Sequence, residues 1–322
     1  MTEGHRDHGM LAGAAVATAG AVGPDAQMPR KDRAAAVSIA SNALLIMLKL
    51  AAAAITGSIA ILTEAAHSSI DLIASVVAFY SVRKADEPAD EDHPYGHQKV
   101  ENLAAAIEGM LILLGAGIIV FESTRRLSQG AEVESIGVGI AVIAFSALAN
   151  LVVSGYLYRR ARATDSPALE GDAAHLRADA FTSTGVLAGL ALVEITGIQE
   201  IDSITALLVA VAIVVAGVRI LNRSSRVLVD EALPPEELDA VRQAIEDHGA
   251  PEVVGFHKLR ARRAGSRRYV DLHVQFRAGT TLQRAHLISH ELQNAIRSRL
   301  RGADVLIHLE PAKSDEPEPP LS

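Results

Sequence analysis

The segment Thr63-Glu64-Ala65-Ala66-His67-Ser68-Ser69-Ile70-Asp71 places an imidazole and a carboxylate inside an apolar stretch that runs from about residue 57 to residue 82. Side chains four residues apart lie on the same face of a helix, one turn from each other, so His67 and Asp71 would share a site. If this helix crosses a membrane, burying the two groups in hydrocarbon costs several kcal/mol unless they face a cavity or a partner. The pair therefore indicates a functional site in a membrane helix.

The same spacing returns in His175-Leu176-Arg177-Ala178-Asp179, at the start of another long apolar segment. Because the chain contains no cysteine, a metal site in it must be built from His, Asp and Glu. Two imidazole nitrogens and two carboxylate oxygens can surround a divalent ion tetrahedrally, a geometry that zinc accepts without a ligand-field penalty. The two pairs predict one intramembrane metal site formed by His67, Asp71, His175 and Asp179.

Metal binding at such a site would be linked to protons. A histidine must be neutral to bind an ion, and its ordinary pKa lies near about 6.5, so metal binding should release protons and metal release should recover them. The two carboxylates would offset the charge of the ion inside the membrane. This linkage is the thermodynamic basis of metal/proton exchange.

The composition favours helices in a membrane. Of the 322 residues, 49% are hydrophobic but only 3% are aromatic and none is Trp, so the apolar content is mostly Ala, Val, Ile and Leu. Such a composition is typical of aliphatic helices rather than of a soluble core. The net charge of −8 argues against a nucleic acid as a partner.

Six apolar segments each reach the roughly 20 residues that are needed to cross about 30 Å of hydrocarbon. The turns between the first two and between the last two are short, so these helices should be antiparallel neighbours. We predict an all-α bundle of six transmembrane helices over residues 34–226, with the lipid bilayer as its partner. The spans lie near residues 35–56, 59–82, 100–124, 135–158, 172–196 and 201–221.

Basic residues indicate the orientation of the bundle. Lys and Arg precede the first span and follow the second, fourth and sixth, whereas the turns at 56–58 and 196–200 carry none; Arg125 and Arg126 are the exception. The positive-inside rule then predicts a multi-pass protein of the inner or plasma membrane with both termini in the cytoplasm. Residues 1–33 and 313–322 are expected to be disordered tails, the second of them acidic, and no signal peptide is predicted.

A small α/β domain is predicted over residues 227–312. A helix should begin at Pro234-Pro235-Glu236-Glu237, because Pro and acidic residues are favoured in a first helical turn, and end near His248. Two strands are predicted near 254–262 and 268–277, the second with alternating apolar and polar residues, and Arg263-Ala264-Gly265-Ser266 should join them as a hairpin turn. A helix near 281–300 and a strand near 304–310 complete an αββαβ order.

The loop Pro88-Ala89-Asp90-Glu91-Asp92-His93-Pro94-Tyr95-Gly96-His97-Gln98-Lys99-Val100-Glu101 carries a specific motif, His-Pro-Tyr-Gly-His followed by Lys and Glu. With the two His-x-x-x-Asp pairs and the six spans, the chain resembles the cation diffusion facilitator family from about residue 34 to residue 312. The resemblance implies a homodimeric metal/proton antiporter that exports zinc, or cadmium, cobalt, iron or manganese, by alternating access. It also implies a metallochaperone-like cytoplasmic domain that dimerises.

The resemblance also implies residue roles. The two His-x-x-x-Asp pairs would be the transport site. The loop would hold a second metal site, the cytoplasmic domain a third, and a charge interlock would tie the dimer contact. The implied groups are Asp90, His93 and His97 in the loop, His257, His273, His286, His308 and Glu310 in the cytoplasmic domain, and Lys99 with Asp230 in the interlock.

Two features of the residues qualify these roles. The family has Asp where this chain has Glu310, which puts a binuclear cytoplasmic site in doubt. Some members have Asp where this chain has His67, and a nitrogen-rich site favours zinc over manganese or magnesium. Cobalt, cadmium and iron stay open. In the loop, Pro94 and Gly96 disfavour a helix, so a turn must present both histidines, and its carboxylates should attract cations.

The sequence is also compatible with other interpretations of these residues and of the protein's function. The polar residues in the spans, such as Asn42, Lys49 and Asn150, also suit interhelical hydrogen bonds. A membrane metalloenzyme would need a His-Glu-x-x-His motif, and the sequence has none. A membrane-anchored metal sensor without transport would use the cytoplasmic domain but would leave the intramembrane pairs unexplained.

Overall fold

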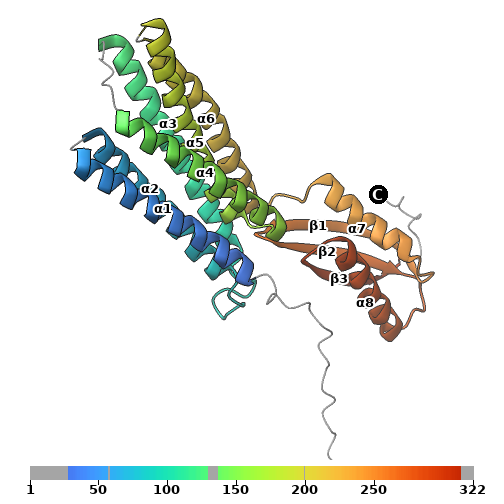
Figure 1. The fold of residues 1–322 in the computed structure, drawn as a ribbon. Helices are drawn as coiled ribbons and strands as arrows, with labels where there is room; N and C mark the ends of the chain where they lie inside the picture. Colours follow the sequence, from blue (N-terminus) through green and yellow to red (C-terminus); the bar gives the residue numbers. More distant parts are fainter. Residues whose placement is uncertain (1–27, 57–58, 130–136, 199, 313–322) are drawn as a thin grey trace, which may run out of the picture.

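A computed structural model of the chain describes residues 28–56, 59–129, 137–198 and 200–312. Long helices form one part of the molecule and a small α/β domain extends from one end of them (Figure 1). The elements are α1 (Met28–Thr56), α2 (Ile59–Ala85), α3 (Lys99–Gln129), α4 (Gly137–Thr164), α5 (Pro167–Thr196), α6 (Glu200–Leu228), α7 (Pro235–His248), β1 (Val253–Ala264), β2 (Arg267–Phe276), α8 (Leu282–Arg299) and β3 (Ala303–Pro311).

The six predicted membrane helices all form, which confirms the fold class. Each has 27 to 31 residues, and at 1.5 Å per residue this gives a length of roughly 40–46 Å, more than the hydrocarbon thickness. Over the described residues, α1, α3, α4, α5 and α6 are long and apolar enough to cross a membrane. Helix α2 is not among these five, and the side chains of its first turns lie outside the description, so its crossing stays a prediction.

Small residues allow the helices to pack closely. Gly109 on α3 faces the backbone of α6, where an added Cβ would lie 3.0 Å from the Leu221 nitrogen. Gly217 on α6 faces the side chain of Leu113, also at 3.0 Å from an added Cβ. Alanines fill most of the remaining core between the helices. Membrane helices lack a hydrophobic drive to associate in lipid, so close approach of small residues is what holds such pairs together. Helix α5 contacts all the other five helices and is the centre of the bundle.

Helix α1 begins at Met28, whereas the sequence suggested a tail up to residue 33. The reason lies in Lys31, whose Nζ is 2.9 Å from Glu101 on α3 and 3.4 Å from Asp86 after α2. Both Lys31 and Glu101 are buried, and Glu101 also accepts a short hydrogen bond from Ser166, the N-cap of α5. One buried network therefore joins four helices at the end of the bundle that carries the small domain.

The small domain has one sheet in the order β1-β2-β3, with β1 antiparallel and β3 parallel to β2. Alternate residues of β2, Val270, Leu272 and Val274, are buried against Ile245 of α7 and Ile288 of α8 in a single apolar core. Both helices therefore cover one face of the sheet. The other face is open, and His273 lies on it because it alternates with the buried residues.

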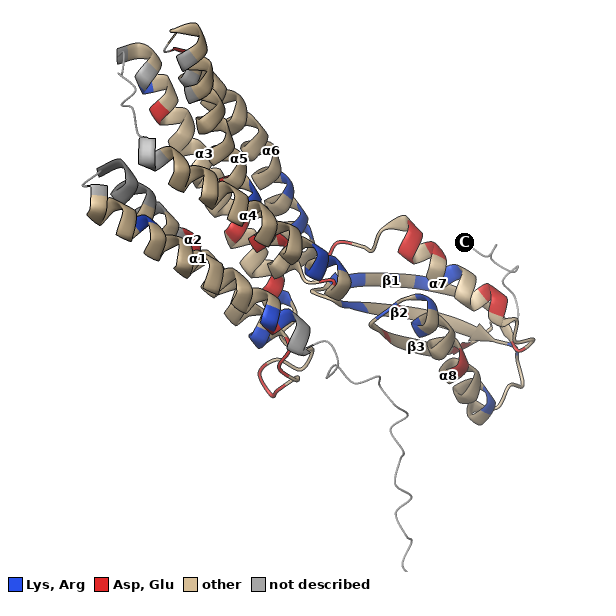
Figure 2. Ribbon diagram, viewed as in Figure 1, with Lys and Arg blue, Asp and Glu red and all other residues tan. Residues whose placement is uncertain are grey.

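The small domain is fixed to the helices through the β1–β2 hairpin. Gly265 has a φ of 55°, as a two-residue turn requires, and its N–H donates to Asn102 on α3 at 2.8 Å. The hydroxyl of Tyr269 donates to the carbonyl of Tyr95 in the loop after α2 at 2.8 Å. Lys and Arg residues gather at the helix ends nearest this domain (Figure 2), as the positive-inside pattern predicts for one side of the membrane.

We expect Lys31→Met to destabilise the protein strongly, because it leaves the Glu101 carboxylate buried without its ammonium partner. Breaking one half of a buried pair costs about 3–5 kcal/mol, whereas removing both charges costs much less. Thermal unfolding followed by circular dichroism in detergent measures the effect. The double variant Lys31→Met/Glu101→Gln should recover much of the loss. If the double variant is less stable than the single one, the buried pair does not hold the helix ends.

Candidate metal centres

The intramembrane centre joins α2 to α5. The Nε2 atom of His175 lies 3.2 Å from Asp71 Oδ1 and 3.7 Å from Asp179 Oδ2. One ligand atom from each of these three residues lies within 4.8 Å of the others, and Asp71 and His175 are buried. Helix periodicity explains the arrangement on α5, because Asp179 is one turn beyond His175. His67 lies on α2, and its side chain is outside the described part of the structure.

A ladder of polar side chains supports this centre from α1. Asn42 donates to the carbonyl of Asp71 at 3.4 Å and to the hydroxyl of Ser75 at 2.8 Å. Ser75 in turn donates to Asp172 on α5 at 3.1 Å and contacts Ser38 at 2.9 Å. These bonds orient α2 against α5, which fixes the distance between Asp71 and His175. Asn42 therefore has the interhelical role that its position in a span suggested.

Two buried carboxylates near the centre were not selected from the sequence. Asp172 is fully buried one turn before His175, and Glu108 on α3 is fully buried with no hydrogen-bond partner for either carboxylate oxygen. Glu108 packs beside Gly171, whose missing side chain makes room for it. An ionisable residue inside an apolar span is the signal that could have found both.

The loop between α2 and α3 forms a second cluster. Asp90 accepts from the His93 backbone N–H at 2.6 Å and contacts His93 Nδ1 at 3.1 Å, and its other oxygen is 3.2 Å from His97 Nε2. Gly96 closes a turn with a φ of 83° and an N–H that donates to the His93 carbonyl at 2.9 Å. The centroids of the His93 and His97 rings lie 4.5 Å apart. His97 is buried, and its polar contact is the one between Nε2 and Asp90.

A row of histidines crosses the open face of the sheet. His257, His273 and His308 are paired across the three strands by the sheet register. Glu310 lies beside the row, with Oε2 2.8 Å from His257 and Oε1 2.6 Å from His273, whereas His308 is 3.8 Å away. The side chain of Glu310 therefore contacts two imidazoles, and His257, His273 and Glu310 form a compact group of ligand atoms.

His286 is not brought to this row within the chain. It lies on α8, on the other side of the sheet, and its Nε2 is 3.2 Å from that of His290, one turn along the helix. His248, at the end of α7, contacts Glu291 at 3.2 Å. The resemblance implied that His286 joins the strand histidines, but within one protomer the sheet separates them.

Lys99 and Asp230 come together within one protomer, although the resemblance implied a pair at the dimer contact. The Nζ of Lys99 is 2.8 Å from Asp230, and Arg262 on β1 is 2.8 Å from the same carboxylate oxygen. The hydrogen bond from Lys99, followed by that from Arg262, lowers the pKa of Asp230. This clamp links the start of α3, the end of α6 and the cytoplasmic domain.

Comparison with known proteins identifies the family. The sequence profile of the cation efflux transmembrane domain matches residues 35–229, and that of the cation efflux protein cytoplasmic domain matches residues 233–312. The chain belongs to the cation diffusion facilitator family. An uncharacterized transporter of Synechocystis, sll1263, is 35% identical over 280 residues, which cover 86% of this chain and 89% of the relative.

Other relatives of this cation diffusion facilitator have named functions. The cation-efflux pumps FieF of Serratia proteamaculans and Yersinia pestis are each 33% identical over 89% of this chain and cover 94% and 95% of the relatives. Two solved structures of CzrB, one of them a zinc form, are 32% identical, cover 25% and 27% of this chain and 99% of their own, and have TM-scores of 0.25 and 0.26. Family membership makes the protein a multi-pass membrane protein of a cation-efflux family.

We expect Lys99→Ala and Arg262→Ala each to raise the pKa of Asp230 towards its ordinary value. Because the folded pKa is lowered, the two bonds stabilise the fold above the ordinary pKa of Asp, and this stabilisation is lost as the pH falls through the lowered pKa. Carboxyl chemical shifts followed by NMR during a pH titration measure the change. Arg260→Ala, on the same strand as Arg262, is the matched control. An unchanged Asp230 titration in both variants would contradict the clamp.

Proposed function

We propose that this family member exports Zn²⁺ in exchange for protons through the centre of Asp71, His175 and Asp179, with His67 as the fourth ligand. The observation that carries the proposal is the convergence of two carboxylates and an imidazole from two membrane helices at a buried position. Soluble cores seldom bury such groups together, because each must be desolvated. A divalent cation supplies the compensating charge.

The donor set favours zinc over harder ions. Imidazole suits zinc and other late transition metals, whereas manganese and magnesium prefer sites made only of oxygen ligands. The described part of the centre supplies one imidazole, and His67 would supply the second. Cobalt, cadmium and iron share enough of this chemistry to compete, and geometry would decide among them.

Proton exchange follows from the same residues. His175 binds an ion only when its Nε2 carries no proton, so the arriving ion displaces protons from the centre. After the ion leaves, the closely spaced carboxylates and the imidazole recover protons, which limits the net charge that is left buried. Glu108 and Asp172 lie in the same buried region and have the chemistry to carry further protons. The exchange therefore needs no cofactor and no covalent step.

The topology proposal places both termini and the small domain in the cytoplasm. The gathering of Lys and Arg at the domain end of the helices supports it (Figure 2). Residues 34–226 would then form the transport domain and 227–312 the cytoplasmic domain, with tails at 1–33 and 313–322. We propose that two chains associate through the cytoplasmic domain. The sequence profile that matches this domain is named for a dimer.

The loop and sheet clusters would hold further ions. Asp90, His93 and His97 would bind one ion where the loop meets the small domain, and His257, His273 and Glu310 would bind another on the open sheet face, with His308 beside them. His286 could reach such a site only from a second protomer. These ions would let the cytoplasmic domain respond to metal and regulate transport.

We expect Asp179→Ala to abolish zinc-driven proton flux in proteoliposomes, because it removes a ligand and a negative charge from the centre. The intact protein should exchange zinc for protons under the same conditions. Asp239→Ala, an exposed carboxylate on α7 remote from the three clusters, is the control and should retain full flux. Equal flux in the Asp179 variant would place the transport site elsewhere. Metal binding without flux in the intact protein would favour the alternative of a membrane-anchored sensor.

We expect Lys99→Ala to reduce transport without changing zinc affinity at the intramembrane centre. The Lys99–Asp230 pair is partly exposed, so its loss should cost less than about 1 kcal/mol of stability, yet it joins the helices to the cytoplasmic domain. Transport in vesicles and zinc binding by calorimetry separate the two effects. Unchanged transport would show that the clamp has no role in the cycle.

A further inference from the structure

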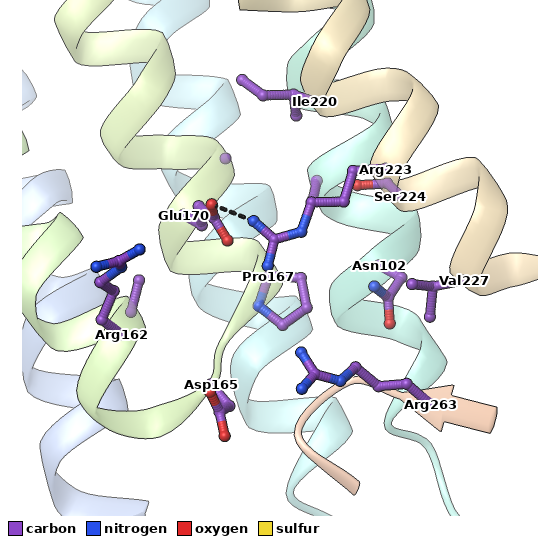
Figure 3. A pocket seen from close by; sticks show the side chains of 13 residues that line it. Asn102, Arg162, Asp165, Pro167, Glu170, Ile220, Arg223, Ser224, Val227 and Arg263 are labelled. Atoms are coloured by element: carbon purple, nitrogen blue, oxygen red, sulfur yellow. Dashed lines mark hydrogen bonds and ion pairs between the residues drawn. The ribbon is translucent and has the colours of Figure 1, made fainter. Parts of the chain in front are cut away.

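A cavity of about 430 Å³ lies where the helices meet the cytoplasmic domain, away from the three metal centres. Its walls come from the start of α3, the α4–α5 junction, the end of α6 and the β1–β2 hairpin (Figure 3). Four candidate membrane spans end at this level, so the cavity lies at one edge of the membrane. The volume is sufficient for a phosphate group together with part of a headgroup.

Three arginines from three different elements line the cavity: Arg162 of α4, Arg223 of α6 and Arg263 of β1. Figure 3 shows the guanidinium groups of Arg223 and Arg263 on either side of Pro167, the first residue of α5. The N-terminus of this 30-residue helix adds a positive dipole end to the same cavity. Arg223 and Arg263 flank this helix N-terminus, and two cations beside a positive dipole end suit an anion rather than a metal ion. Arg162 is exposed and lies farther away, at the rim of the cavity (Figure 3).

The carboxylates of this region do not balance the arginines. Glu170 binds Arg223 at 2.6 Å, and Asp165 is 3.3 Å from Arg268, which is not part of the cavity lining. Glu237 is shared, at 2.8 Å, by Arg263 and Arg268. These three carboxylates therefore pair with three arginines, and Arg162 is a fourth arginine in the region. Among the described residues, Arg162 contacts the ring of Tyr158, and no carboxylate pairs with it.

Arg263 is only partly satisfied by its contact with Glu237. Its Nε is buried and makes no hydrogen bond. Burial lowers the pKa of the Arg263 guanidinium, and the positive charges of Arg268 and Arg223 lower it further. A bound anion would relieve both effects. Asn102 and Ser224 add neutral groups to the lining, and the amide oxygen of Asn102 is already occupied by the Gly265 N–H, which leaves its NH₂ available as a donor.

We propose that this cavity binds the phosphate group of an anionic ligand, held by Arg223 and Arg263 at the N-terminus of α5, with the exposed Arg162 at the rim to contact the rest of the headgroup. Guanidinium groups recognise phosphate through paired N–H donors, and basic pockets between membrane helices bind anionic lipid headgroups. The ligand would contact α4, α5, α6 and β1 at once. It would therefore couple the membrane composition, or the phosphate concentration, to the position of the cytoplasmic domain.

The test uses the full chain in nanodiscs of phosphatidylcholine with or without phosphatidylglycerol. One readout is the thermal stability of the protein, and the other is the amount of bound lipid, measured by native mass spectrometry. Phosphatidylglycerol should raise the melting temperature of the intact protein by several degrees. Arg162→Gln, which leaves no carboxylate without its partner, and Arg263→Gln should each reduce lipid retention at least fivefold. Arg219→Gln, an exposed arginine on α6 outside the cavity, is the matched control and should behave as the intact protein.

A second arm separates the two sources of phosphate. In neutral detergent, inorganic phosphate is compared with chloride at the same ionic strength. Stabilisation by phosphate that is lost in Arg263→Gln would assign the cavity to a free phosphate group, whereas stabilisation by phosphatidylglycerol alone would assign it to a lipid. The proposal would be overturned if the intact protein, Arg162→Gln and Arg263→Gln retained lipid equally and were stabilised equally. It would also be overturned if neither anion had an effect on the intact protein.

Discussion

The cost of burying ionisable groups between apolar helices is the constraint on which the rest of this structure depends. His175 and Asp71 are both buried and lie 3.2 Å apart across two helices. Neither could remain there alone, because an unpaired charge in a low-dielectric interior costs several kcal/mol. The surrounding ladder from Asn42 through Ser75 to Asp172 uses polar groups to set the distance between α2 and α5. The same contacts that hold the bundle therefore shape its candidate metal centre.

A second buried ionic group performs a different task. Lys31 and Glu101 join α1 to α3 at the end of the bundle where the cytoplasmic domain is attached, and Ser166 adds the start of α5. The hairpin of the small domain contacts Asn102, the residue next to Glu101. The helix ends, the loop with the Asp90, His93 and His97 cluster, and the sheet are thus linked to one another. A shift of the small domain would act directly on the helices that carry the proposed transport residues.

The sheet separates the candidate metal ligands of the cytoplasmic domain from its apolar core. Strand alternation sends Val270, Leu272 and Val274 to the helices and leaves His273 on the open face. The register then aligns His257 and His308 with His273, although these residues are far apart in the sequence. The core and the ligands use opposite faces, so the domain can lose or gain an ion while its apolar packing stays intact.

The sequence by itself determined the helices, the α/β order and the His-x-x-x-Asp pairs, because hydrophobic length and helix periodicity are local properties of the chain. It also identified the loop, since Pro94 and Gly96 exclude a helix there. Only the tertiary structure decided which distant groups meet. Glu108 is beside α5 because Gly171 leaves space for it, and His286 is apart from the strand histidines because α8 covers the other face of the sheet. Lys31 belongs to a helix rather than a tail because its partners Glu101 and Asp86, more than 50 residues away, are brought to it by packing. Contacts of this kind depend on helix orientation and sheet register, which the periodicity of one segment does not fix.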